Sequence, residues 1–171
     1  MNKHQIAMAA AACTRYDIVC VDKDGNEKWR DVADNLVVTT GLNDLLDKYF
    51  KGSAYTAAHY IGLTDDSPTI AAGDTMASHA GWAEATGYDE AARQDFTPGT
   101  VAAGSVDNSG NVASFSINAS DTIGGLFLAT NATKGGTSGI LYGVAAFTGG
   151  DKAVDDGDTL NVTATATAAA A

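Results

Sequence analysis

Proline and cysteine are both scarce in this chain of 171 residues, which contains two of each. Cys13 and Cys20 are too few for a disulfide framework, and their spacing fits no metal-binding pattern. We interpret Cys20, which stands in an apolar run, as a small buried side chain. No apolar run reaches the roughly 18 residues that a membrane-spanning helix requires. The sequence therefore predicts neither a disulfide-stapled domain nor a protein that crosses a membrane by helices.

Basic side chains are also few, since ten Lys and Arg stand against 21 Asp and Glu, for a net charge of −11. Nucleic-acid binding needs clustered Lys and Arg, so we expect no nucleic-acid partner. The length fits one domain, and a chain of this size buries roughly 68–70% of its unfolded surface. We assign residues 14–167 to that domain. Residues 1–13 are interpreted as an N-terminal arm rather than a secretion signal, and residues 168–171 as an Ala-rich C-terminal tail.

The region at residues 35–63 contains the one convincing helix, predicted over residues 40–51 with a strand on each side. Thr39 or Thr40 is expected to cap its first turn, and Gly52 to close it in the left-handed conformation. The apolar residues recur at i, i+3, i+4, i+7 and i+8, and they are Leu42, Leu45, Leu46, Tyr49 and Phe50. Because the rest of the chain offers only strands, we expect this stripe to be buried against a sheet.

Alternation of apolar and polar residues predicts strands through most of the remaining chain. Asp24-Gly25 is typical of a hairpin turn, and Gly124-Gly125 predicts a bulge or a close backbone approach. The predicted strands cover residues 15–22, 27–31, 55–63, 101–106, 112–117, 123–128, 140–147 and 159–167. Strands of this spacing favour a mainly β fold, an antiparallel β-sandwich or jelly-roll-like domain with one short amphipathic helix.

Residues 69–100 break this pattern and form a long irregular connection of the sort that is often functional. The segment carries three aromatic residues, Trp82, Tyr88 and Phe96. We take these three as candidate interface residues, because aromatic side chains often carry the binding energy of protein contacts. The alternative is that they fill the core beneath the connection.

Motifs for catalysis or cofactor binding are missing, since the chain has no GxSxG, HExxH or Walker-type sequence. The DKDGNE run at residues 22–27 is interpreted as a turn, because Ala33 replaces the glutamate that a calcium loop needs at its twelfth position. The glycine-rich loop at 135–139 lacks the lysine and following helix of a phosphate cradle. His79 is the one candidate for a hydrolytic triad; we interpret it as a loop hydrogen-bonding residue, and His59 as a packed or interface residue. The sequence predicts no enzyme activity, catalytic residue, cofactor or metal.

Four segments of the chain carry a family resemblance. They are residues 35–46 (NLVVTTGLNDLL, preceded by Trp29), 61–64 (IGLT), 74–84 (DTMASHAGWAE) and 157–163 (GDTLNVT). The most characteristic piece is Gly81-Trp82-Ala83-Glu84 with the Tyr88 and Arg93 that follow it. Together these segments, spanning residues 29–165, resemble small virion structural proteins of tailed bacteriophages.

The resemblance implies a structural virion protein without enzyme activity or cofactor, of the capsid decoration or cementing type. Such proteins sit on the capsid surface as homo-oligomers, by habit trimers, and bridge neighbouring capsomers, commonly through extended arms. The implied partners are the major capsid protein and further copies of this chain, with no nucleic acid and no membrane. The alternatives are a tail, neck or fibre component, including a receptor-binding module, and a carbohydrate-binding adhesive module.

Overall fold

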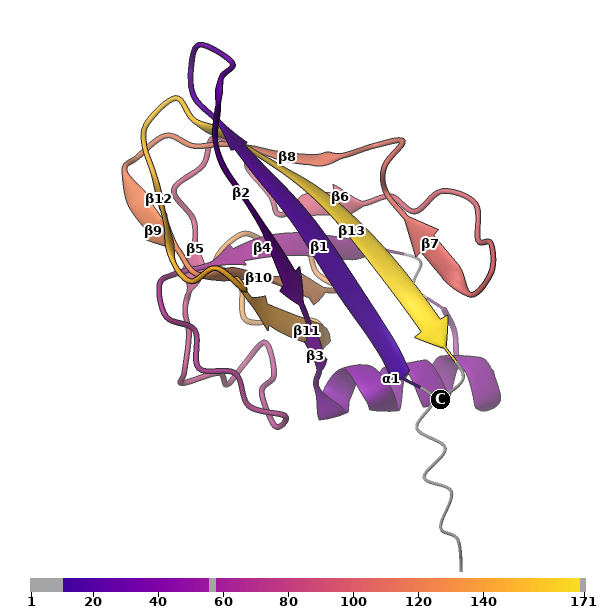
Figure 1. Cartoon of the computed structure of the whole chain (residues 1–171). Coiled ribbons are helices and arrows are strands. Elements are labelled where there is room, and N and C mark those ends of the chain that lie inside the picture. The colour runs from indigo at the N-terminus through magenta and orange to yellow at the C-terminus, as the bar shows by residue number, and fades with distance from the viewer. Residues whose placement is uncertain (1–10, 56–57, 170–171) are drawn as a thin grey trace, which may run out of the picture.

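Antiparallel sheets make up most of the domain in the computed structural model, which describes residues 11–55 and 58–169 (Figure 1). Among these residues the first sheet has five strands in the order β2-β1-β13-β7, and β8 pairs with a second part of β13. β1 and β13 pair along their whole length, with Ala11 opposite Ala169, so both ends of the described chain emerge side by side. The strands are β1 (Ala11–Val21), β2 (Glu27–Asp34), β7 (Ser105–Asp107), β8 (Ala113–Ser116) and β13 (Thr159–Ala169).

The second sheet has six strands within the described ranges, in the order β3-β11-β10-β4-β5, and β6 pairs with the other part of β4. Its strands are β3 (Leu36–Val37), β4 (His59–Thr64), β5 (Glu84–Ala85), β6 (Gln94–Phe96), β10 (Gly125–Ala129) and β11 (Leu141–Ala146). The strands β9 (Asp121–Ile123) and β12 (Lys152–Val154) form a separate ribbon. Of these, β5 and β6 lie in the segment expected to be irregular, and β12 and all of β9 except Ile123 lie outside the predicted strands.

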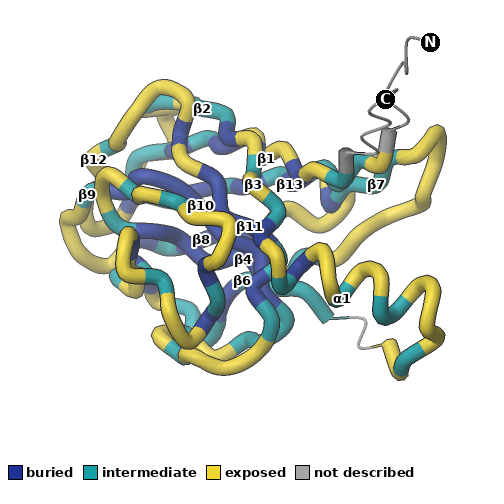
Figure 2. The backbone as a smooth tube through the Cα atoms, turned by 90° about the horizontal axis from the view of Figure 1, so that it is seen from below, coloured by how far each residue is buried: buried dark blue, intermediate teal, exposed yellow. Residues whose placement is uncertain are grey.

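The main hydrophobic core lies between the two sheets (Figure 2). Alternate residues of each strand point inward, as the two-residue period of a strand requires. Burying each large apolar side chain contributes about 1.5–3 kcal/mol. The first sheet supplies Tyr16, Ile18, Phe115, Leu160 and Val162, and the second supplies Ile61, Leu63, Leu126 and Leu128.

A second, smaller core covers the opposite face of the second sheet. All five residues of β10 are buried, because its alternate side chains enter different cores. Phe127 and Ala129 point away from the first sheet and pack with Met76 and Trp82 of the long connection. The ring centroids of Trp82 and Phe127 lie 5.2 Å apart. Part of the irregular connection therefore forms a third layer over the second sheet.

The predicted helix forms as α1 (Thr39–Phe50), within one residue of its expected limits. Its closing residue is also confirmed, since Gly52 has a φ of +71°. The predicted threonine cap is wrong: the N-cap residue is Val38, and no side chain caps the first turn. The two hydroxyls instead donate to carbonyl groups outside the helix, Thr39 to Ala72 and Thr40 to Leu141. Tertiary hydrogen bonds thus replace the cap and fasten the start of α1 to β11.

The direction predicted for the apolar stripe of α1 is wrong, because the stripe is exposed rather than buried. Its five residues are exposed by 44% (Leu42), 42% (Leu45), 54% (Leu46), 79% (Tyr49) and 77% (Phe50). The side facing the sheets carries Gly41, Asp44 and Lys48, at i, i+3 and i+7. Gly41 is the buried residue of the helix, and a Cβ atom there would overlap the carbonyl group of Tyr142. This close approach of α1 to β11 orients the helix, so the leucines turn outward.

The ends of the domain also differ from the prediction. β1 begins at Ala11, so residues 11–13, assigned to the arm, belong to a strand, and β13 continues to Ala169 through two residues assigned to the tail. Residues 1–10 of the predicted arm and 170–171 of the predicted tail lie outside the described residues. The close approach predicted at Gly124-Gly125 is confirmed, since a Cβ atom on Gly125 would overlap the carbonyl oxygen of Ala145.

Asp31 on β2 gives the domain a testable pH dependence. Burial raises the pKa of its carboxyl, but hydrogen bonds from the Val32 N–H, the Lys152 ammonium and the Gly149 N–H outweigh it and hold the pKa below the usual value. An unfolded aspartate has a pKa of about 3.9. The stabilisation is therefore fully present above that pH and is lost as the pH falls through the lower folded pKa.

We expect Asp31→Asn to flatten the acid limb of the stability curve. Urea unfolding between about pH 2 and 7 measures this, because the slope of stability against pH counts protons taken up on unfolding. The control is Asp34→Asn, a substitution at an exposed position of the same strand. An unchanged acid limb in the Asp31 variant would show that this carboxyl has no part in acid unfolding.

Candidate functional site

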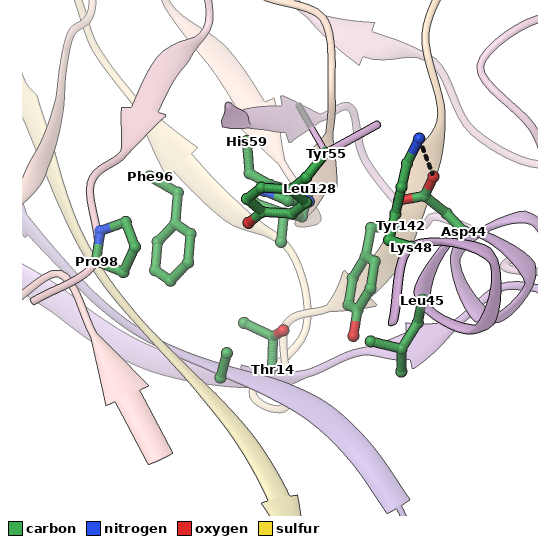
Figure 3. Close-up of a pocket in the computed structure, with 11 residues that line it drawn as sticks. Thr14, Asp44, Leu45, Lys48, Tyr55, His59, Phe96, Pro98, Leu128 and Tyr142 are labelled. Carbon is green, nitrogen blue, oxygen red and sulfur yellow. Dashed lines mark ion pairs between the residues drawn. The ribbon is translucent and has the colours of Figure 1, made fainter. Parts of the chain in front are cut away.

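A partly open pocket of about 220 Å³ lies between α1 and the two sheets (Figure 3). Leu45 lines it from α1, His59 and Tyr142 from the second sheet, Thr14 from the first, and Phe96 from β6. Small-molecule sites usually occupy about 300–1,000 Å³, so this pocket is small for one. It opens beside the exposed stripe of α1, because Leu45 belongs to both.

The walls of this pocket are mainly apolar, and their two charged side chains, Asp44 and Lys48, form an ion pair with each other (Figure 3). The His59 ring stands edge-on to Tyr142, with centroids 6.0 Å apart. Burial lowers the pKa of His59, against a smaller opposite effect of Asp44, and burial raises the pKa of Tyr142. Both rings are therefore uncharged at neutral pH. Lys48 extends along the rim, where its Nζ donates to the Ala54 carbonyl oxygen at 2.7 Å. Such walls suit an apolar group rather than an ion.

Two of the three candidate interface aromatics are buried and do not offer a surface to a partner. Trp82 packs on Phe127 beneath the long connection, and its Nε1 donates to the Asp74 carboxylate at 3.1 Å. Tyr88 lies in the main core, edge-on to Phe115 with ring centroids 5.0 Å apart. Their packing matches the alternative reading, in which they fill the core. Phe96 is partly buried and differs from them, because it reaches the pocket beside α1.

His79 makes a local structural contact. Its ring stacks on Trp82 with centroids 3.8 Å apart, and its Nδ1 donates to the Trp82 carbonyl oxygen at 2.9 Å. The nearby Asp74 carboxylate accepts from the Ala71 N–H and from Trp82. The interpretation of His79 as a loop hydrogen-bonding residue is confirmed.

The DKDGNE run is the turn between β1 and β2. The Asp22 carboxylate accepts hydrogen bonds from the N–H groups of Asp24 and Asn26, and Gly25 has the left-handed φ of +85° that such a turn needs. Within residues 11–55 and 58–169, no group of three His, Cys, Asp or Glu side chains is placed to hold a metal ion. The turn interpretation is confirmed.

The feature that the sequence prediction missed is the exposed side of the helix, which we call the α1 apolar face. We define it as Leu42, Leu45, Leu46, Tyr49 and Phe50 together with Tyr55, which follows the helix and is 69% exposed. The largest apolar patch on a typical monomer covers about 300–600 Å² and often has a function. A signal for this orientation was present, because a glycine within a helix often marks the side that packs closely. Gly41 begins the stripe that continues with Asp44 and Lys48.

No protein-family model, curated protein or solved structure matches this chain. Among the described residues, no helix has the length and apolar content needed to cross a bilayer.

Proposed function

We propose that this chain is a structural protein of a tailed-bacteriophage virion and, within that class, a capsid decoration or cementing protein. The observation that carries the proposal is the α1 apolar face, which stands exposed on an acidic β domain and adjoins a small apolar pocket. A large exposed apolar patch is typical of a protein contact surface. The resemblance of four segments to phage virion proteins supports the choice of particle.

The fold also supports a structural virion protein. We infer that the two facing antiparallel sheets form a β-sandwich of the jelly-roll-like type. Their shared core and the alternation of inward-facing residues support this, because sandwiches bury the apolar face of each sheet against the other.

The mechanism we propose is stapling of capsomers. A protein that binds across the seam between two capsid subunits stabilises only the assembled lattice, by mass action. Copies that bind together gain further from their high effective concentration. The major capsid protein is the proposed partner, at the capsid surface, and residues 1–10 are proposed as an additional contact arm. The first described residue, Ala11, pairs with Ala169 of β13, so the described chain begins and ends side by side.

Copy number per particle tests this proposal. The proteins of purified virions are separated, and the amount of the 17.4 kDa chain is compared with that of the major capsid protein. A decoration protein is expected within a few-fold of the capsid protein. An amount tens of times lower would move the chain to the tail, neck or fibre. Absence from particles would contradict a virion role.

The arm is tested on the same particles, by adding purified protein to capsids that lack it. Deletion of residues 1–10 is expected to lower occupancy without changing the thermal midpoint of the isolated domain. The deletion stops at residue 10 because Ala11 to Cys13 pair with β13. Unchanged occupancy would remove the arm from the proposal while leaving the decoration role in place.

A further inference from the structure

We infer that the α1 apolar face is a self-association surface, through which two copies of this chain pair with their α1 helices antiparallel about a two-fold axis. The inference deepens the proposed function, on which it rests for its place in the particle. It assigns the contact between copies to one helix. The sheets are left free to meet other partners.

The exposed area fits an interface between proteins. Tyr49, Phe50 and Tyr55 are exposed by 79%, 77% and 69%. Aromatic side chains present about 150–250 Å² each, so these three expose on the order of 350–550 Å². The three leucines, each about half exposed, add to it. The total approaches the roughly 800 Å² per partner that a stable interface buries.

The charge of the helix favours a second copy of this chain. The whole chain carries −11, which opposes contact between most of its surface and another copy. Helix α1 and its C-cap are an exception, because Asp44 and Asp47 balance Lys48 and Lys51. Each lysine pairs with an aspartate of its own helix, Lys48 with Asp44 and Lys51 with Asp47, so the helix carries no net charge toward a second copy. Two copies that meet through this helix therefore avoid the charge repulsion that the rest of the acidic surface would impose.

The position of the helix also permits this contact. Figure 2 shows α1 at the periphery of the domain, away from the space between the sheets. It is held there through its first turn, by the hydrogen bond from Thr40 to Leu141 and by the close packing of Gly41 on Tyr142. A two-fold contact between identical faces closes on itself and yields a discrete dimer rather than a filament.

The test is the mass of the full chain in solution, measured by light scattering and sedimentation over a range of concentrations. The expected mass is twice 17.4 kDa. The double variant Tyr49→Ser/Phe50→Ser is expected to weaken the dimer at least about 100-fold, because central aromatic residues carry most of the affinity of an interface. The matched control is Val112→Ser, which should dimerise normally. Val112 is 41% exposed and directly precedes β8, which lies far from α1 in Figure 1.

Circular dichroism and the thermal midpoint show that the variants fold, as expected for exposed positions. A monomer at all concentrations overturns the inference, and so does association that the helix variant leaves unchanged. A trimer overturns the two-fold arrangement. If only the chain lacking residues 1–10 dimerises, those residues cover the face in the intact chain, which also overturns it. If the protein is abundant in virions but monomeric in solution, the proposed function stands and this inference is wrong. If it forms the dimer but is absent from virions, the inference stands and the proposed function is wrong.

Discussion

Replacing Arg93 with Met is expected to lower the free energy of unfolding by about 3–5 kcal/mol, because it leaves a buried carboxylate unpaired. The Arg93 side chain is fully buried and binds both carboxylate oxygens of Glu84, at 2.9 and 2.7 Å. It also donates to the carbonyl oxygens of Asn131 and Gly136 and lies 5.0 Å from the centre of the Phe127 ring. One side chain therefore ties the long connection to the β10–β11 loop. Urea unfolding measures the loss.

The double variant Arg93→Met/Glu84→Leu separates the two parts of this effect. Replacing both members of a buried ion pair with apolar residues is often nearly neutral, so the double variant should regain part of the lost stability. The recovery should be incomplete, because three main-chain groups still lose their hydrogen-bond partners. They are the carbonyl groups of Asn131 and Gly136 and the Gly135 N–H, which donates to Glu84 at 2.9 Å. A loss below about 1 kcal/mol in the single variant would contradict the role given to this pair. The segment that most supports the family resemblance thus contains a structural ion pair.

Gly41→Ala is expected to displace the first turn of α1 from β11 and to destabilise the domain by about 1–3 kcal/mol, the usual cost of overpacking. The added Cβ atom would overlap main-chain atoms of Tyr142, which belong to a strand paired on both sides. The backbone hydrogen bond from Val38 to Tyr142, now 3.1 Å long, should weaken with it. Hydrogen exchange of the α1 amides measures the local effect, and thermal unfolding the global one.

Gly110→Ala is the control for this prediction, because a Cβ atom there meets nothing within 4 Å and its φ is not left-handed. Protection of the α1 amides should fall in the Gly41 variant and stay unchanged in the control. Equal protection in both would show that the contact with Tyr142 does not position the helix. Since the dimer proposed above needs α1 in place, the Gly41 variant should also associate more weakly.

The helix shows what hydrophobic periodicity does and does not determine. The spacing of Leu42, Leu45 and Tyr49 predicted a helix within one residue of its observed limits. Periodicity identifies residues that share a side, but it does not say what that side meets. The deciding contact is the packing of Gly41 on a strand about 100 residues later in the chain. A contact of this range leaves no periodic pattern in the sequence, and its one local signal is the glycine itself.

The strands and the long connection were predictable to different degrees. Alternation located most strands of both sheets, because the longer strands each have one face in the main core. The third layer was missed, although β10 carries the run Leu126, Phe127 and Leu128, which has no polar side. Such a run indicates burial on both faces, and hence a cover for the second one. Trp82 supplies that cover, so it was better read as a core residue than as an interface residue.

The antiparallel pairing of β1 with β13 gives the molecule two opposite poles. Both ends of the described chain leave the sheet near α1, whereas the β1–β2 hairpin projects from the other end (Figure 1). A domain fused directly to Ala11 or to Ala169 would therefore crowd the helix. A peptide inserted between Asp24 and Gly25 would instead be displayed away from it, on a turn where the backbone is already exposed. In a dimer that forms through α1, that turn lies at the end of each domain opposite the contact, which makes it the site for presenting foreign sequences.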